Sequence, residues 1–257
     1  MKTYNPAEIE RKQRAEVNAG DRAARKATHA EQTARRRFYQ FRAAYNAAAA
    51  AINAGARLRV SVSNGNSKMG AIPSISLLPL VTCAGGFNCP CAVKCYAAKI
   101  AALYSNTLKA YARNTALALH APAVFWEQFR RTVAGLRFFR LNVAGDIPSA
   151  AFFAELVKTA AAAPHCTILA FTKRAAIVNS YIDNNGALPD NLKIIFSNWG
   201  RNEQPNPHGL PVSNVIFTGE APADDWKICG GNCYNCACRG VGCWELKNGE
   251  TIAFYEH

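Results

Sequence analysis

The stretch Thr82–Ala98, TCAGGFNCPCAVKCYAA, places four thiols within thirteen residues, and the other features of the chain are best understood around it. Its cysteines are Cys83, Cys89, Cys91 and Cys95. Two glycines and a proline lie between them, so we expect the segment to form a loop rather than a helix or a strand. A loop that gathers several thiolates around one point suits a soft metal centre.

The spacing of these cysteines distinguishes between kinds of metal site. Zinc sites usually come as paired C-x2-C knuckles. Here seven residues separate Cys83 from Cys91, and three separate Cys91 from Cys95. Uneven spacing on a loop that enters a helix is more typical of an iron–sulfur site. A disulfide pair or buried free thiols are the alternatives, and the lack of a secretory signal disfavours them.

The composition indicates a folded protein of moderate size. With 257 residues, half of them hydrophobic, the chain can form one α/β barrel-type domain, or one domain with an appendage. Residues 1–20 contain no apolar run, and no stretch approaches the roughly 20 apolar residues of a membrane span. We therefore expect a cytoplasmic protein with no membrane partner. Ten cysteines in that reducing compartment favour metal binding over disulfides.

The formal charge of +13 is concentrated at the N-terminus, where residues 1–60 carry a balance of +8. Residues 6–54 are rich in Ala, Arg and Lys, which predicts helix, interrupted at 18–21 and resuming at Arg22. Such a concentration of positive charge is typical of a nucleic-acid partner, although a solvated face that binds nothing is the alternative. Interleaved aromatics either stack on bases or dock the helix on the main domain. The candidate phosphate ligands are Arg35, Arg36, Arg37 and Arg42.

Downstream of this segment, short apolar strands alternate with helices. We expect strands at 57–63, 72–81, 137–144, 166–172, 192–197, 212–218 and 252–254, and helices at 96–120, 125–136, 150–163 and from 174 to about 183. Helices of ten or more residues between short strands imply parallel pairing, and the site of a parallel sheet lies where its strands end. Polar residues gather at those ends: Cys83, Asp146, Thr172, Lys173, Ser197, Asn198, Thr218 and Glu220.

A second group of cysteines lies in the segment CGGNCYNCACRGVGC, residues 229–243. Its five cysteines are Cys229, Cys233, Cys236, Cys238 and Cys243. Glycines around them let the backbone fold tightly about an ion. Four of the thiols would make a closed zinc site or hold a second iron–sulfur cluster, which favours a structural role. We expect Cys238 to be the cysteine that is not a ligand.

Several segments resemble a known family. They are GNSKMGAIPSISLLPLVTC from Gly65, CAVKCYA from Cys91, FRLNVAGDIPS from Phe139, AFTKR from Ala170, and C-x3-C-x2-C from Cys229. Together, over roughly residues 63–257, they resemble the gene product eighty-eight family of phages and plasmids, which is similar to radical S-adenosylmethionine (SAM) proteins. The resemblance implies a partial (β/α) barrel of radical-SAM type, in a phage or mobile-element protein of the host cytoplasm.

The resemblance also implies cofactors. A [4Fe-4S] cluster would be held after the first barrel strand by Cys83, Cys91 and Cys95, with one iron left open for SAM. Ala98 stands where the usual C-x3-C-x2-C motif has its third cysteine, and Cys89 is an extra thiol. If Cys89 took the open position, the protein would be a non-enzymatic iron–sulfur or zinc protein that binds nucleic acid or a host protein.

Residues for SAM itself follow from the same resemblance. Gly145, Asp146 and Pro148 belong to GDIP, which stands where radical SAM proteins often carry Gly-Gly-Glu-Pro, so Asp146 would meet the methionine amino group. Lys173 would meet a carboxylate, and Ser197 the ribose hydroxyls. The expected organisation is a basic helical extension (1–56), a barrel with the cysteine-loop site (57–225) and a cysteine-rich metal-binding module (226–257).

Overall fold

The computed structural model describes residues 6–200 and 203–256, with side chains from Arg22 onward except that of Ala23. In this part of the chain, seven strands form one parallel sheet in the order β1-β2-β3-β4-β5-β7-β6. The strands are β1 (Ser74–Ile75), β2 (Phe138–Leu141), β3 (Thr167–Thr172), β4 (Leu192–Ser197), β5 (Val212–Ile216), β6 (Lys227–Ile228) and β7 (Thr251–Tyr255). The α/β class and the parallel pairing expected from the sequence are confirmed.

Seven helices and two short 3-10 turns accompany the strands in the described ranges. They are α1 (Pro6–Asn53), η1 (Gly86–Asn88), α2 (Tyr96–Leu103), α3 (Ser105–His120), α4 (Pro122–Val133), α5 (Ala150–Ala162), α6 (Ala175–Asn185), α7 (Cys233–Arg239) and η2 (Gly242–Trp244). The sheet has two edges, β1 and β6, and does not close into a barrel within the described residues. No helix there is long and apolar enough to cross a membrane.

The long helix α1 is continuous, so the interruption expected at residues 18–21 is wrong. A single internal glycine such as Gly20 costs a helix only about 1 kcal/mol relative to alanine, and the surrounding Ala, Arg and Lys residues favour the helix. Gly55 ends α1 as expected. It has a φ of 87°, its N–H donates to the Ile52 carbonyl, and the Ala56 N–H donates to the Ala51 carbonyl. This is the Schellman arrangement that glycine favours.

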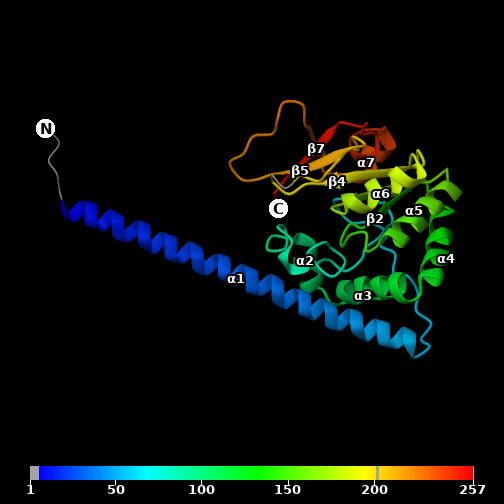
Figure 1. Ribbon diagram of the computed structural model, residues 1–257, viewed down its shortest axis with the longest axis horizontal. Helices are drawn as coiled ribbons and strands as arrows, with labels where there is room; N and C mark the ends of the chain where they lie inside the picture. Colours follow the sequence, from blue (N-terminus) through cyan, green and yellow to red (C-terminus); the bar gives the residue numbers. More distant parts are fainter. Residues whose placement is uncertain (1–5, 201–202, 257) are drawn as a thin grey trace.

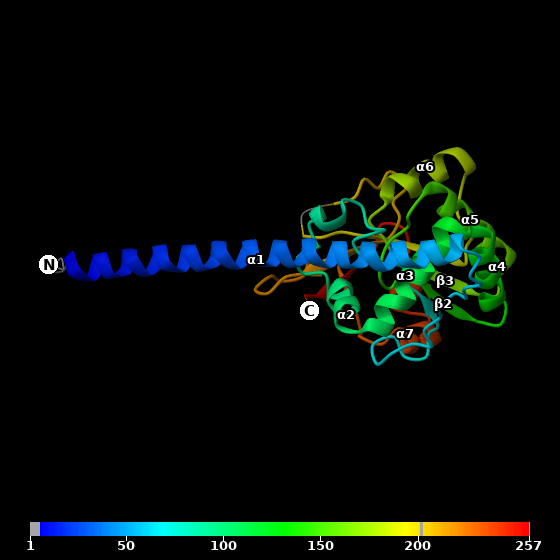
Figure 2. The same ribbon diagram turned by 90° about the horizontal axis from the view of Figure 1, so that it is seen from below.

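The C-terminal part of α1 belongs to the body of the protein. Ala34, Phe41 and Ala49 are buried, and α1 runs along α3 while its N-terminal part projects beyond the rest of the chain (Figures 1 and 2). Phe38 and Tyr45 pack against the same hydrophobic cluster as Phe41. The docking role expected for these aromatics is confirmed.

Residues 57–63 do not form the expected strand. Side chains of the helices satisfy their backbone instead, because Gln128 accepts from the Val60 N–H at 2.8 Å and Asn114 accepts from the Ser61 N–H at 2.7 Å. A single antiparallel bridge joins Ser63 to β1.

Two other expected elements are shorter than the sequence suggested. The strand predicted at 72–81 is reduced to β1, because Pro73 and Pro79 lack the N–H that a ladder requires. The helix predicted at 96–120 is divided into α2 and α3 at Tyr104, whose backbone is extended. Ser105 and Asn106 follow it, and such residues favour helix starts over interiors.

The two faces of the sheet have different covers. On one face, Phe139, Leu141, Ile168 and Phe196 pack under α4, α5 and α6 in the largest hydrophobic cluster. Ser149 starts α5 as predicted, since its hydroxyl accepts from the Phe152 N–H. The opposite face carries a smaller cluster formed by the C-terminal segment and residues near β1: Met69, Ile72, Leu169, Ile195, Ala237, Trp244, Leu246 and Ile252. The cysteine loop belongs to a third cluster, in which Cys89 and Ala92 pack with Phe41 of α1 and Ala98 of α2.

Candidate metal centre

A buried carboxylate joins the ends of the strands at the carboxyl edge of the sheet. Asp146, after β2, is 4% exposed, and its Oδ1 accepts from the Thr172 hydroxyl at 2.5 Å and from the Ile147 N–H at 2.8 Å. Its Oδ2 accepts from the Lys173 N–H at 3.0 Å, and the Asp146 N–H donates to the Thr82 hydroxyl. Burial raises the pKa of Asp146, while these hydrogen bonds act in the opposite direction. The carboxylate therefore fixes the end of β2 to that of β3.

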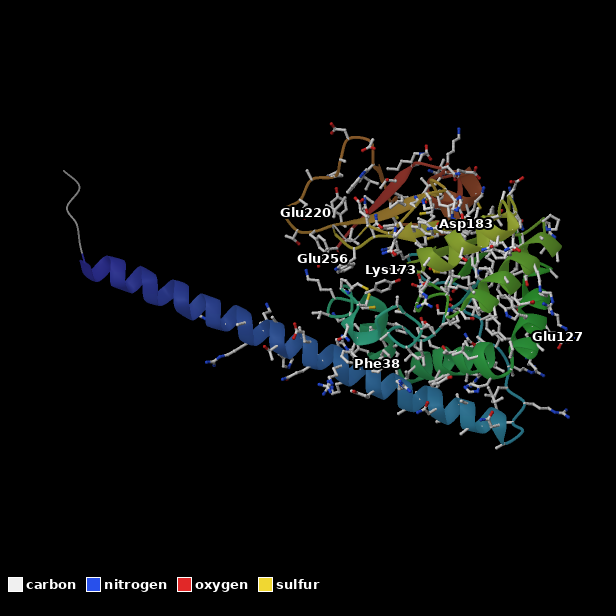
Figure 3. All side chains as sticks on the ribbon, in the orientation of Figure 1. Phe38, Glu127, Lys173, Asp183, Glu220 and Glu256 are labelled. Carbon is white, nitrogen blue, oxygen red and sulfur yellow. The ribbon has the colours of Figure 1, made fainter. Side chains whose placement is uncertain are left out.

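Lys173 connects this network to the next strand and to the cysteine loop. Its Nζ donates to the Ser197 hydroxyl, at the end of β4, at 2.8 Å. Figure 3 shows Lys173 between the sheet and the α2 region. Its charge favours the thiolate forms of three cysteines, Cys89, Cys91 and Cys95. The single rim predicted from the polar residues after β2, β3 and β4 is therefore present.

The cysteine segment is a loop with one 3-10 turn, as expected. The Cys89 and Cys91 sulfurs lie 3.0 Å apart, and the Cys95 sulfur accepts from the Ala98 N–H at the start of α2. The hydrogen bond between the paired thiols lowers the pKa of Cys89 to about 6 and raises that of Cys91. Burial raises the pKa of Cys95, and burial together with the Asp146 charge raises that of Cys83 to about 12.

The thiols of the cysteine loop lie near one another, but they are not arranged around a common point at which a metal ion could bind. Cys89 and Cys95 both affect the pKa of Cys83, so all three are within electrostatic range. Within the described residues, no three His, Cys, Asp or Glu side chains are placed so that they could hold a metal ion. The donor chemistry fits a soft metal, and the positive backbone φ angles of Gly85 and Gly86 are those of a sharply turning loop.

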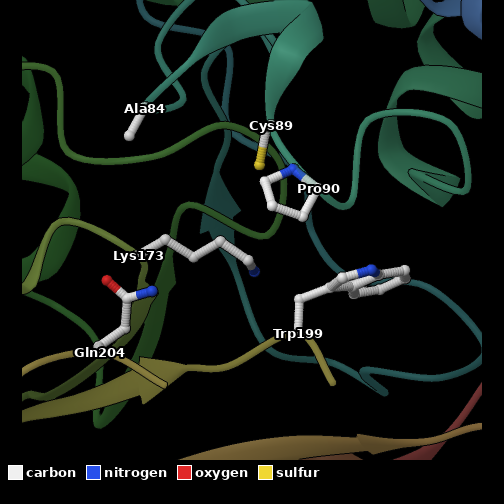
Figure 4. A pocket seen from close by; sticks show the side chains of 6 residues that line it. All are labelled: Ala84, Cys89, Pro90, Lys173, Trp199 and Gln204. Atoms are coloured by element: carbon white, nitrogen blue, oxygen red, sulfur yellow. The ribbon is translucent and has the colours of Figure 1, made fainter. Parts of the chain in front are cut away.

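An open pocket of about 160 Å³ adjoins the loop (Figure 4). Its lining residues are Ala84, Cys89, Pro90, Lys173, Trp199 and Gln204. Figure 4 shows the Lys173 side chain reaching into the space between Pro90 and Trp199. The pocket thus combines a thiol, a cation, an aromatic face and an amide. The sequence analysis missed Trp199 and Gln204. The signal that could have found Trp199 was its place directly after the β4 end, at Asn198.

Other predicted site residues have different positions. Gly145 has a φ of 78°, and a Cβ there would lie 2.7 Å from the Leu77 carbonyl oxygen, so the backbone approach requires glycine. The Pro148 carbonyl accepts from the Arg174 guanidinium at 3.4 Å. Neither residue lines the pocket. Thr218 and Glu220 are exposed, and the Glu220 carboxylate accepts from the Phe217 N–H. No hydrogen bond joins either to the Asp146 network within the described residues.

The second cysteine group lies on the face of the sheet that carries the smaller cluster. Cys229, Cys233, Cys236 and Cys243 are partly buried against the cluster that contains Trp244. The Trp244 indole N–H donates to the Cys233 carbonyl at 3.1 Å. The Trp244 ring packs edge-on against Phe138 of β2, so the predicted packing of this module on the sheet is confirmed. Cys238 is exposed, and its thiol pairs with the Tyr234 hydroxyl. The cysteine expected to be spare thus has a different environment from the other four.

The predicted nucleic-acid residues lie on α1 beside the cysteine loop. Arg35, Arg36 and Arg42 are exposed and Arg37 is half-buried. The Arg35 guanidinium lies 5.9 Å from the ring centroids of both Tyr39 and Phe87, and Phe87 belongs to the loop. Phe38 packs edge-on against the Phe87 ring at 5.2 Å. The basic surface of α1 is therefore continuous with the loop.

These features define a class of α/β protein with an open parallel sheet, a cysteine loop at its carboxyl edge and a second cysteine group on one face. The family model described as Gene product 88 matches residues 22–245, and the chain belongs to that family. This confirms the family part of the resemblance. The match begins at Arg22 rather than near residue 63, so most of α1 is included. Searches of curated proteins and of solved structures found no significant match.

Proposed function

We propose that this protein is an iron–sulfur protein of radical-SAM type, which binds a [4Fe-4S] cluster in the cysteine loop and SAM in the adjoining pocket. One observation carries the proposal. Lys173, which is hydrogen-bonded to Asp146 and to Ser197, lines an open pocket together with Cys89 of the cysteine loop, at the carboxyl edge of a parallel sheet. In sheets of this kind, ligands bind where the strands end.

Cys83, Cys91 and Cys95 are the residues that would hold the cluster. A three-cysteine set leaves one iron free for a small ligand, and thiolates are the usual protein ligands of such clusters. When bound, the cluster would supply the electron that cleaves SAM and so allows hydrogen abstraction from a substrate. Lys173 stabilises the thiolate forms on this loop, because its charge favours deprotonated Cys91 and Cys95.

The pocket offers complementary groups for SAM. The Lys173 ammonium would pair with the carboxylate of the methionine moiety, and the Ser197 hydroxyl, already its partner, would reach the ribose. Trp199 presents an aromatic ring on which a purine would stack. Asp146 has one donor on Oδ2, and a carboxylate oxygen can accept a second hydrogen bond, so an ammonium group is the natural additional donor.

We further propose that the substrate or partner is a nucleic acid held by α1. Arg35, Arg36 and Arg42 are exposed together on the surface next to the loop, and Tyr39 is 54% exposed beside them. Guanidinium groups bind phosphates, and an exposed aromatic ring stacks on unpaired bases. This surface and the pocket are linked through Phe87, so a bound strand would pass close to the cluster site.

The test of the cluster is anaerobic reconstitution of the full chain, followed by counts of iron and sulfide and an absorption spectrum. With SAM and dithionite added, formation of 5′-deoxyadenosine is expected. Cys91→Ala should lose loop-bound iron and product, while Cys238→Ala, which removes an exposed thiol, should retain both. An iron-free preparation made without air, or a loaded chain that leaves SAM intact, would contradict the proposal.

A second candidate function is favoured by one observation, the 3.0 Å contact between the Cys89 and Cys91 sulfurs. That proximity would let Cys89 supply the fourth thiolate, which would give a closed cluster and a non-enzymatic protein that binds nucleic acid or a host protein. Cys89→Ala decides between the two. Retained iron and measurable SAM binding support the enzyme, whereas loss of the cluster supports the fully ligated protein.

The nucleic-acid surface is tested separately by binding of a single-stranded oligonucleotide at several salt concentrations. Replacing Arg35, Arg36 and Arg42 with Gln should weaken binding, and each lost phosphate contact should lower the salt slope by about 0.7. The matched control is the variant R130Q/R131Q/K158Q, which removes three exposed cations of α4 and α5 that pair with Glu127 and Glu155. If the two variants bind the oligonucleotide with equal affinity and equal salt dependence, α1 does not hold the nucleic acid.

A further inference from the structure

Arg140, in β2, was not singled out by any sequence pattern, yet it contacts the second cysteine group directly. One of its terminal guanidinium nitrogens donates to the Cys233 sulfur at 3.2 Å. Its Cζ lies 4.8 Å from the centroid of the Phe171 ring, and its Nε is buried without a hydrogen-bond partner. Cys243 and Tyr96 are also within electrostatic range of the guanidinium.

The charge of this guanidinium has to be balanced locally. Arginine stays protonated in proteins, and a partly buried cation is costly unless an anion or several acceptors compensate it. Among the described residues, no carboxylate forms an ion pair with Arg140. The candidate anions that the structure places around it are sulfurs. A neutral thiol is a weak acceptor, whereas a thiolate is a good partner for a guanidinium.

The thiols next to Arg140 belong to one cluster. Cys229, Cys233, Cys236 and Cys243 all pack against the same hydrophobic residues. Among the described residues no three of them are already placed around one point, so a metal ion would have to draw them together. Glycine backbone approaches the sulfurs: a Cβ at Gly242 would lie 3.5 Å from the Cys236 sulfur. Four thiolates around a divalent metal ion, or around a [4Fe-4S] cluster in its oxidised form, carry a net charge of about −2.

We propose that Cys229, Cys233, Cys236 and Cys243 bind a metal centre as thiolates, and that Arg140 is a positioning residue that partly neutralises this centre by donating to the Cys233 sulfur. The inference extends the proposed function in treating the chain as a metalloprotein, but it concerns the second cysteine group and not the loop. Because Arg140 lies in β2, this contact also fixes the C-terminal segment to the sheet that carries the cluster site.

The experiment uses the full chain with Cys83, Cys91 and Cys95 replaced by Ala, so that the loop cannot compete. Zn²⁺ alone is titrated anaerobically against a chromophoric chelator, and Co²⁺ reports the number of thiolates through its charge-transfer absorption. Loss of an outer hydrogen bond to a ligand typically weakens metal binding about 10- to 100-fold. We expect that loss for Arg140→Met and for Arg140→Gln, with partial recovery in Arg140→Lys.

The matched control is Arg137→Met. Arg137 is exposed, lies over the Phe138 ring at 5.0 Å and precedes the same strand, but no hydrogen bond joins it to a sulfur in the described residues. Metal affinity in Arg140→Met and Arg140→Gln equal to that of Arg137→Met would overturn the role of Arg140. Failure of the triple-Ala chain to bind one Zn²⁺ would overturn the site itself. The loop site is judged independently, in a chain that lacks the four C-terminal thiols.

Discussion

The two cysteine groups differ in what surrounds them. In the loop, the thiols lie beside an open pocket, and Cys89 and Lys173 line it. In the C-terminal group, four of the five thiols pack against the hydrophobic cluster of Trp244, which is 1% exposed, and α7 carries two of these four. A metal site that must accept a ligand needs an open side, whereas a structural site is saturated by protein ligands. Under the proposed function, the loop would therefore be the reactive site and the C-terminal group the stabilising one.

The backbone of the two regions supports the same division. The loop has one short 3-10 turn and is linked to the end of β7 by the partly exposed ion pair between Lys94 and Glu256 at 2.5 Å. An exposed pair of this kind contributes at most about 1 kcal/mol. The C-terminal group is attached by hydrogen bonds from the Cys233 and Tyr234 N–H groups to the turn at residues 66–70, and by β7 within the sheet.

The largest expected effect separates the two groups by stability. Replacing Cys233 and Cys236 with Ala should lower the free energy of unfolding by on the order of 5 kcal/mol, because the binding free energy of a structural metal is folding free energy. Replacing Cys91 and Cys95 should cost only about 1 to 2 kcal/mol, since the loop can open locally. Anaerobic denaturant unfolding measures both. Equal losses of unfolding free energy in the two variants would contradict the proposed difference between the two cysteine groups.

Trp244 tests whether the C-terminal group is held by packing as well as by metal. Trp244→Ala should lower the free energy of unfolding by about 3 to 5 kcal/mol, because it leaves a cavity against Phe138 and frees the Cys233 carbonyl. Tyr255→Ala, at a 57% exposed position at the end of β7, should change it by about 0.5 kcal/mol or less. A small effect of Trp244→Ala in the metal-loaded chain would show that the metal alone holds this segment.

Gly86 tests the fit between the loop and α1. It has a φ of 55°, and a Cβ there would lie 3.3 Å from the Phe38 ring. Gly86→Ala should therefore cost about 1 to 2 kcal/mol and reduce the loop's iron content. Gly135→Ala is the control, because its added Cβ meets open space and its φ is not positive. If both variants keep wild-type stability and iron, the loop does not depend on α1.

Cys166 belongs to neither cysteine group, and we expect it to have the smallest effect on the free energy of unfolding. Burial raises the pKa of its thiol from 9.0 to about 11, so between these values the unfolded thiol is ionised while the folded one is neutral. Its contribution to stability is present below pH 9 and is lost as pH rises toward 11. Relative to Cys166→Ala, the wild-type chain should lose about 1 kcal/mol more between pH 8 and pH 10. Parallel pH profiles for the two chains would contradict this.

The fold class was predictable because its signals are local. β4 agrees residue for residue with the apolar run LKIIFS, and Ser149 marks the start of α5 as a capping residue should. The failures have a common cause, namely tertiary partners. The backbone at residues 57–63 bonds to Gln128 and Asn114 from distant helices, which no local pattern reveals. The five-cysteine segment contains α7, started by Asn232, a helix that the sequence analysis did not predict.

The sequence predicted at which edge of the sheet the candidate site lies. It did not predict the hydrogen bonds that connect the side chains there. The polar residues after β2, β3 and β4 meet because parallel strands end at the same edge. That Asp146 is turned toward backbone donors, and that Trp199 faces the pocket, depends on side-chain orientation that spacing does not encode. Arg140 was invisible for the same reason, since its partner Cys233 lies 93 positions away in the sequence.

The unbroken course of α1 has a geometric consequence. From Pro6 to the first described buried side chain, Ala34, the helix runs about 40 Å at 1.5 Å per residue, and Phe38, just after this segment, contacts Phe87 of the cysteine loop. A partner that grips the far tip stands too distant to reach the pocket. If α1 binds the partner that we propose, its length would set the distance between the point where that partner is held and the pocket.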